Sequence, residues 1–231
     1  MKVFCLAILG GLAWLSTGFV FGQEYPHAFP RAGTTKLLEN DRVIVWDATW
    51  PDGVPQPYHR HRYDMTGVFF RWGPLKVTRL DGSFTASTEP FDIPWVFFQA
   101  KGVTHKEEGV GTPERHALMI DMKEYSPRRG ETHGDLPVAF PRTGAEVELD
   151  SPRATVWDTR WLPGEETFHV HTRDTVVIFV EGGTIRTREP DGFEQLTTYA
   201  PEDVLFLRAG TAHGTTAMGA SPRAMFYVLK D

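Results

Sequence analysis

The chain has 231 residues and a formal net charge of −6, from 24 lysines and arginines against 30 aspartates and glutamates. An acidic balance of this size disfavours nucleic acid and anionic membrane surfaces as partners. The single cysteine, Cys5, lies in an apolar N-terminal segment whose removal excludes disulfides, thiolate metal ligands and cysteine nucleophiles from the mature protein.

Residues 1–22 have the pattern of a signal peptide. Lys2 is the only charged residue before Glu24, residues 3–21 are almost wholly apolar, and the small residue Gly22 precedes the expected cleavage site before Gln23. We therefore expect a secreted or periplasmic protein with no stable membrane insertion after cleavage. The segment is also long enough to stay as a membrane anchor, and the sequence leaves this alternative open.

The chain after the signal segment predicts an all-β fold. Its 22 glycines, 17 prolines and 13% aromatic residues are atypical of a helical bundle, and short apolar runs bounded by Gly, Pro and Asp recur. These runs are residues 68–70, 95–98, 176–180, 204–207 and 224–229. The dipeptides Asp81-Gly82 and Asp191-Gly192 predict tight turns between strands.

An internal repeat divides the chain into two similar units. The tripeptide Phe-Pro-Arg occurs at 29–31 and at 140–142, and the pattern Val-Trp-Asp-x-x-Trp occurs at 45–50 and at 156–161. We predict one barrel over residues 29–124, a linker over 125–139 and a second barrel over 140–231. The repeated tryptophans are interpreted as core or rim aromatics, not as ligand-stacking residues.

Six histidines at matching places in the two units are the candidate site residues. In each unit an H-x-H pair places two side chains on one face of a strand, and a third histidine follows a Gly-x-x-His turn. The six are His59, His61, His105, His169, His171 and His213. Three neutral imidazoles favour one divalent transition metal per unit (Fe, Mn, Ni, Cu or Zn) with positions open to water or substrate. The alternative is a set of hydrogen-bonded barrel histidines without metal.

The other three histidines of the mature chain have no counterpart in the second unit. They are His27, His116 and His133. We assign them to the surface or to loops.

The candidate histidines and the glycines around them resemble the cupin family, and the repeat makes the chain similar to a bicupin. The family's first motif combines a glycine, an H-x-H pair, a glutamate and a second glycine, and here Gly53 and Gly164 precede the two H-x-H pairs. In the second motif Gly102 and Gly210 precede the third histidines. The resemblance implies two tandem double-stranded β-helix (jelly-roll) barrels, each holding a metal with its three histidines.

The family's glutamate ligand has no match at its motif position, where the two units have Met65 and Thr175. The neighbouring Asp64 and Asp174 are repeated, but strand alternation turns them from the histidine face, so we expect them outside the coordination sphere unless a bulge brings them back. Three histidines without a carboxylate resemble the quercetin-dioxygenase-like cupins, which hold iron for oxygen-dependent cleavage. Such a site keeps the full charge of the metal and favours anionic substrates.

Two classes of function follow. The first is an enzyme: a metal-dependent oxidoreductase of dioxygenase-like type acting on a small oxygenated organic molecule, or an isomerase or lyase using the same histidines. The second is a non-catalytic secreted binder of a metal, a small molecule or a carbohydrate. No catalytic base is assigned, because Glu107 and Glu108 after His105 are interpreted as rim residues.

The sequence does not determine the oligomeric state of the protein, and it is compatible with a homo-oligomer. Because each unit carries a complete histidine trio, we expect metal to load independently in the two barrels and each metal to support the folding of its own barrel.

Overall fold

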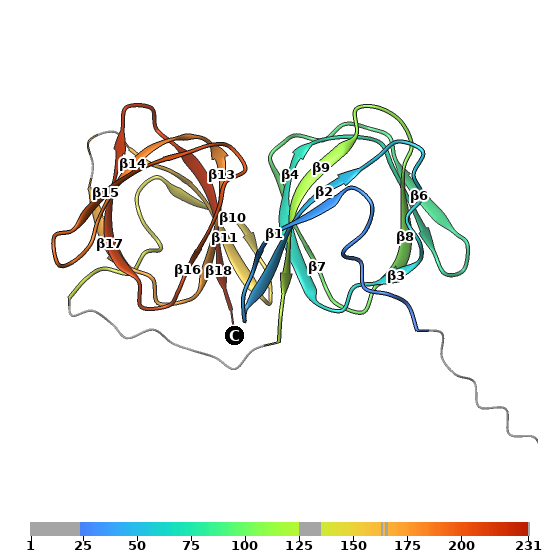
Figure 1. The fold of residues 1–231 in the computed structure, drawn as a ribbon, viewed down its shortest axis with the longest axis horizontal. Coiled ribbons are helices and arrows are strands. Elements are labelled where there is room, and N and C mark those ends of the chain that lie inside the picture. Colours follow the sequence, from blue (N-terminus) through green and yellow to red (C-terminus); the bar gives the residue numbers. More distant parts are fainter. Residues whose placement is uncertain (1–23, 125–134, 163, 165, 231) are drawn as a thin grey trace, which may run out of the picture.

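The computed structural model describes residues 24–124, 135–162, 164 and 166–230. The predicted signal segment 1–22, His133 and positions 125–134 of the predicted linker lie outside these residues. Every regular element in the described part is a strand, and no helix there is long and apolar enough to cross a membrane. Figure 1 shows two barrels side by side: barrel 1 contains β1–β9, in blue to green, and barrel 2 contains β10–β18, in yellow to red.

The strands of barrel 1 are β1 Thr34–Glu39, β2 Val43–Trp50, β3 His59–Arg60, β4 Asp64–Arg71, β5 Leu75–Arg79, β6 Phe84–Ser87, β7 Trp95–Gln99, β8 Thr104–Gly109 and β9 Arg115–Met122. Those of barrel 2 are β10 Ala145–Asp150, β11 Ala154–Arg160, β12 Thr167–Val170, β13 Thr175–Glu181, β14 Gly183–Arg188, β15 Glu194–Tyr199, β16 Val204–Leu207, β17 Ala212–Met218 and β18 Arg223–Leu229.

Each barrel consists of one five-stranded and one four-stranded sheet, and the strand order repeats. The large sheets run β1-β2-β9-β4-β7 and β10-β11-β18-β13-β16, and the small sheets run β3-β8-β5-β6 and β12-β17-β14-β15. Even a register shift repeats, between Lys36 and Leu38 in the β1–β2 pair and between Val147 and Leu149 in the β10–β11 pair. The predicted fold class, all-β with two tandem jelly-roll barrels, is confirmed.

The predicted Asp-Gly turns close the β5–β6 and β14–β15 hairpins. Gly82 and Gly192 have φ angles of 82° and 89°, which suit glycine because it lacks a Cβ. The carboxylates of Asp81 and Asp191 each accept the N–H of the residue two positions on, at 2.9 Å. The repeat of both turns keeps the two small sheets alike.

The repeated aromatic motifs pack against each other inside the barrels. The ring of Phe29 stacks on Trp46 with centroids 5.4 Å apart, and Phe140 stacks on Trp157 at 5.2 Å. Trp46 and Trp161 are buried in the interior apolar clusters of their barrels. The Phe-Pro-Arg and Val-Trp-Asp motifs therefore recur because they contact one another in each core.

The central strands of the large sheets are buried on both faces, because the outer faces of these sheets pack against each other between the barrels (Figure 1). One apolar cluster contains seven buried residues from each unit, including Val45, Leu118 and Ile120 of barrel 1 and Val156 and Tyr227 of barrel 2. Neighbouring residues of the same strands face the barrel interiors. Because both faces are buried, the sequences of these strands are continuous apolar runs. The two barrels therefore share a core.

Two of the ion pairs that join the barrels are reciprocal. Arg42 Nε lies 3.1 Å from Asp174 Oδ2, and the matching residues of the other units, Arg153 and Asp64, pair at 2.7 Å. Each aspartate also accepts a backbone N–H, from Lys101 for Asp64 and from Ala209 for Asp174. The repeated aspartates therefore hold the barrels together.

Candidate metal centres

The strand pairing of the small sheets places the third histidine of each trio directly opposite the first. In barrel 1 β3 pairs antiparallel with β8, with His59 opposite His105. In barrel 2 β12 pairs with β17, with His169 opposite His213. Directly opposite residues in an antiparallel pair have their Cβ atoms about 4.5–5.5 Å apart. Residues 46 positions apart in barrel 1 and 44 positions apart in barrel 2 therefore meet inside the barrels.

The glycine of each Gly-x-x-His turn fixes the second histidine of the H-x-H pair. Gly102 N–H donates to the carbonyl of His61, and Gly210 N–H donates to the carbonyl of His171, both at 2.7 Å. Both glycines have a φ of 92°, a conformation that costs other residues energy. The motif glycines thus connect the turn to the second histidine of each H-x-H pair.

Both trios converge, and all their facing nitrogens lie within 4.8 Å of one another. The Nε2 atoms of His61 and His105 are 3.2 Å apart, as are those of His169 and His171. Two nitrogens bound to one metal at about 2.0–2.1 Å, at angles between square and tetrahedral, lie about 3.0–3.4 Å apart. The observed spacing fits a single ion in each barrel. The ligand role of the six histidines stays a prediction.

The hydrogen bonding of the His59 ring is compatible with a metal ligand. His59 Nδ1 lies 3.0 Å from the carbonyl of Pro57, which leaves Nε2 facing the other two histidines. This Nε2 is buried and has no hydrogen-bond partner among the described residues. A buried ring nitrogen with a lone pair and no donor opposite it is suited to a metal ligand.

Burial favours the neutral form of four of the six histidines, His59, His61, His171 and His213. It lowers the pKa of His61 to about 3, with further lowering by His105, and it lowers the pKa of His213 to about 4, with further lowering by Arg142. Burial also lowers the pKa of His59 and, more strongly, of His171. Neutral imidazole is the form that binds metal, so at neutral pH these side chains need not lose a proton to do so.

The structure also locates the residues at and beside the missing glutamate position. Met65 is buried in the interior cluster of barrel 1, and Thr175 lines a cavity of about 40 Å³ beside His171. Asp64 and Asp174 belong to neither histidine group, since both point to the opposite barrel. They lie outside the histidine sites, as strand alternation predicted.

The interpretation of Glu107 as a rim residue was wrong. Its Oε1 lies 3.4 Å from Nε2 of His105, its Oε2 accepts the indole N–H of Trp50 at 2.7 Å, and Arg31 Nη2 is 3.8 Å from the same oxygen. Burial acts to raise the pKa of Glu107, but the hydrogen bond to His105 and the charge of Arg31 hold it well below its usual range. Barrel 1 therefore does have a carboxylate beside its histidines, supplied by β8.

The position of Glu107 carried a signal. It follows His105 by two residues in a strand, so both side chains share a face. Barrel 2 has Thr215 at this position, and its hydroxyl accepts the indole N–H of Trp161 at 3.1 Å. Only barrel 1 thus has a carboxylate beside the trio at this position.

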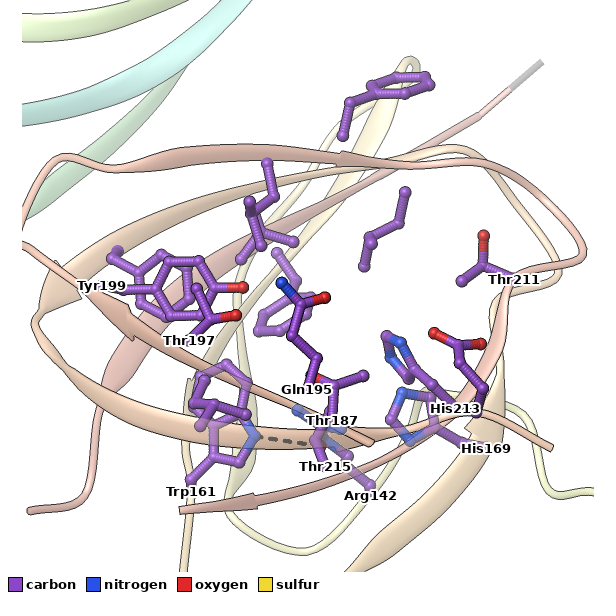
Figure 2. A pocket seen from close by; sticks show the side chains of 18 residues that line it. Arg142, Trp161, His169, Thr187, Gln195, Thr197, Tyr199, Thr211, His213 and Thr215 are labelled. Atoms are coloured by element: carbon purple, nitrogen blue, oxygen red, sulfur yellow. Dashed lines mark hydrogen bonds between the residues drawn. The ribbon is translucent and has the colours of Figure 1, made fainter. Parts of the chain in front are cut away.

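Barrel 2 contains a cavity of about 420 Å³ that reaches its histidines. Figure 2 shows His169 and His213 at one end of this cavity and Tyr199 at the other. Apolar side chains such as Phe179 and Leu205 line the walls. A volume of this size is typical of small-molecule sites.

Two positions of the matching strand in barrel 1 have large aromatic side chains. Phe97 pairs with β4 where Leu205 pairs with β13, and Trp95 stands opposite Phe69 in the same ladder. The ring of Trp95 stacks on Phe69 with centroids 5.4 Å apart and lies 4.9 Å from that of Phe91. Ring packing of this kind occupies space that barrel 2 leaves open.

One of the unmatched histidines, His116, was misplaced by the sequence analysis, whereas His27 precedes the first strand, in agreement with its assignment to a loop. His116 is not in a loop but buried in β9, where its Nε2 lies 2.9 Å from Asp47. His27 is half-buried, and its Nε2 lies 2.9 Å from Oδ2 of the fully buried Asp121. Asp121 Oδ2 also accepts the indole N–H of Trp46 at 3.0 Å. Both histidines therefore serve as partners for carboxylates.

Comparison with known proteins identifies the fold. No family model and no curated protein matches the sequence. Among solved structures, a cupin 2 conserved barrel protein from Leptotrichia buccalis is 10% identical, with a TM-score of 0.50 over 85% of this chain and 88% of that one. Oxalate decarboxylase from Bacillus subtilis, a protein with Mn(II) centres, is 13% identical, with a TM-score of 0.55 over 82% and 69%. AerE from Microcystis aeruginosa is 11% identical, with a TM-score of 0.52 over 90% and 99%.

Proposed function

The chain has the fold of a bicupin, and we propose that it is a metal-dependent oxidoreductase of dioxygenase-like type that acts on a small oxygenated organic molecule in barrel 2. The observation that supports this most directly is the contact of two histidines of the trio, His169 and His213, with a largely apolar cavity of about 420 Å³. Among the described residues, the group that could hold an ion in barrel 2 consists of His169, His171 and His213. Three protein ligands leave coordination positions for substrate.

A divalent transition metal at this site would supply Lewis acidity and, for iron, manganese or copper, one-electron redox chemistry. The residues of the chain would provide the surroundings. The trio fixes the ion at the polar end of the cavity. Phe179, Tyr199 and Leu205 along the walls exclude water from a bound substrate and contact its apolar part.

A metal-dependent lyase is the second candidate, and one observation favours it. Oxalate decarboxylase from Bacillus subtilis shares the two-barrel fold and contains Mn(II) centres. A lyase would use the same histidines and the same cavity but would consume no oxygen. A carbohydrate binder is less well supported, since the walls of the cavity are mostly apolar.

We also propose that the protein is secreted or periplasmic. This rests on the sequence of residues 1–22 alone, with its apolar run and small residue before Gln23. Acid-rich composition and the lack of cysteine after Cys5 are compatible with that location.

The test combines metal analysis with oxygen uptake. Protein purified without an affinity tag is expected to hold close to two metal ions per chain and to consume oxygen with a member of a panel of small diketones, phenols and flavonoids. His213→Ala should remove one ion and abolish turnover, whereas its match His105→Ala should remove one ion and leave turnover in place. Product formation without oxygen uptake would favour the lyase. Metal bound without turnover of any compound, including dicarboxylates, would leave a binding protein.

A further inference from the structure

The two histidine sites share an arginine and a tryptophan in the same arrangement, called the frame below, and differ two residues after the third histidine. In each barrel an arginine of the Phe-Pro-Arg motif lies over aromatic rings of the core. The guanidinium of Arg31 is 4.7 Å from the ring centroid of Trp50, and that of Arg142 is 5.6 Å from that of Trp161. The indole N–H of each tryptophan then donates to the side chain two residues after the third histidine. That side chain is Glu107 in barrel 1 and Thr215 in barrel 2.

The carboxylate of Glu107 therefore shows what this frame binds. It is in contact with an indole N–H at 2.7 Å, a histidine ring at 3.4 Å and a guanidinium at 3.8 Å. The indole N–H attracts negative charge as a hydrogen-bond donor, and the guanidinium does so as a cation. The histidine ring attracts it when the ring carries a metal or a proton. The site is a carboxylate subsite filled by the protein's own side chain.

Barrel 2 keeps the frame but not the acid. Thr215 is shorter than glutamate, and its hydroxyl satisfies Trp161 at 3.1 Å. Arg142, His213 and Thr215 all line the open cavity, and Figure 2 shows Arg142 and Thr215 near the histidines. The place that the Glu107 carboxylate takes in barrel 1 thus adjoins the cavity of barrel 2.

We infer that barrel 2 binds its substrate through a carboxylate, or an equivalent oxyanion, that takes the place of the Glu107 carboxylate between Arg142 and the trio. The body of the ligand is apolar, because Phe179, Tyr199 and Leu205 line the rest of the cavity. Glu189 lines it as well and would repel an anion, so the carboxylate is expected to depend on the positive charge of Arg142. The inference rests on the proposed function for the metal and names the substrate class.

Barrel 1 has the opposite property. Glu107 fills its carboxylate subsite, and the rings of Phe69, Phe91 and Trp95 pack together in the same barrel. An external carboxylate would have to displace a buried, hydrogen-bonded one. The substrate is therefore assigned to barrel 2, and barrel 1 holds its metal beside an internal anion.

The test measures binding, not turnover. The probes are benzoate and 3-phenylpropionate with their neutral amides, and the readouts are titration calorimetry and intrinsic tryptophan fluorescence, to which Trp161 in the cavity contributes. At least one carboxylate should bind tenfold or more tightly than its amide. Thr215→Glu should supply an internal carboxylate and reduce that affinity at least tenfold, whereas Thr215→Val, which keeps the size of the side chain, should stay within threefold of the wild type. Arg142→Gln should remove the preference for carboxylate over amide.

Metal content and melting temperature, recorded on the same samples, separate the possible failures. Loss of affinity in Thr215→Glu with two ions still bound supports the inference. Equal binding of carboxylates and amides, unchanged affinity in Thr215→Glu, or no binding of either carboxylate overturns it. Carboxylate binding through Arg142 by a protein that holds no metal would support the anion subsite and overturn the proposed function instead. If Thr215→Glu does not fold, the Arg142→Gln comparison decides.

Discussion

Replacement of one histidine in a trio tests both the predicted metal sites and the shared core. His171→Ala takes a ligand from barrel 2, and His61→Ala takes the matching ligand from barrel 1. Each change should lower the metal content from about two ions per chain to about one, and the double change should abolish it. A ligand at a thousandfold excess over its Kd stabilises the folded state by about 4 kcal/mol per site.

The shared apolar cluster determines how this stabilisation appears. Because seven of its buried residues come from each barrel, the two barrels are expected to unfold together. A metal in either barrel should then raise the single melting temperature of the chain, instead of supporting its own barrel alone. For a chain of this length 1 kcal/mol corresponds to about 2–4 °C. Chelation should lower the melting temperature by about 16–32 °C in the wild type and by about half of that in either single variant.

The assay is calorimetry with and without a chelator, alongside metal analysis of each variant. The two single variants serve as controls for each other, since they remove the same chemistry from different barrels. Two separate transitions, only one of which responds to each variant, would refute the shared-core reasoning. Protein that holds no metal, and whose melting does not respond to added divalent ions, would refute the metal sites themselves.

Three further outcomes are expected. Gly210→Ala forces a residue with a Cβ into a φ of 92° and should cost about 1 kcal/mol or more of stability in urea denaturation, with weaker metal binding because Gly210 holds His171. Arg42→Ala leaves the buried Asp174 without its ion pair and should cost about 3–5 kcal/mol, against less for Arg153→Ala at the more exposed pair, as measured in the same denaturation experiment. In metal-free protein the pKa of His213 is lowered to about 4 by burial and by Arg142, so the unfolded state binds more protons below pH ~6.5. Stability should therefore fall from pH ~6.5 toward pH ~4 by about 1.4 kcal/mol per pH unit for that proton, and calorimetry across the range would detect a flat profile as a contradiction.

Much of the fold and of the histidine geometry could be predicted from the sequence because both depend on local rules. Alternation along a strand places His59 and His61 on one face, and the Gly-x-x-His turn at Gly102 returns the chain beside His61. The repeat then supplies the same features again near His169. An alternation of period two, a glycine in a turn motif and a duplication can all be recognised in a linear sequence.

The remaining features depend on contacts between distant segments. His116 is buried because Asp47 of the neighbouring strand β2 lies 2.9 Å away, and nothing near His116 in sequence indicates that partner. Asp64 and Asp174 were correctly separated from the metal sites, but their pairing with Arg153 and Arg42 requires the barrels to face each other. An apolar run buried on two faces looks the same whether the second face meets a helix, another sheet or another barrel.

The differences between the two barrels carry more functional information than their similarities. The features that recur are the histidine trio, the turn glycine, and the tryptophan and arginine of the frame, and the trio is the basis on which metal binding is predicted in both barrels. The differences gather around the cavity: Glu107 against Thr215 beside the third histidine, and Phe97 against Leu205 on the wall. Both of these differences exchange a larger side chain in barrel 1 for a smaller one in barrel 2. Because the space they open adjoins His213 and Arg142, the divergence of the two barrels is accounted for by a ligand that enters one of them.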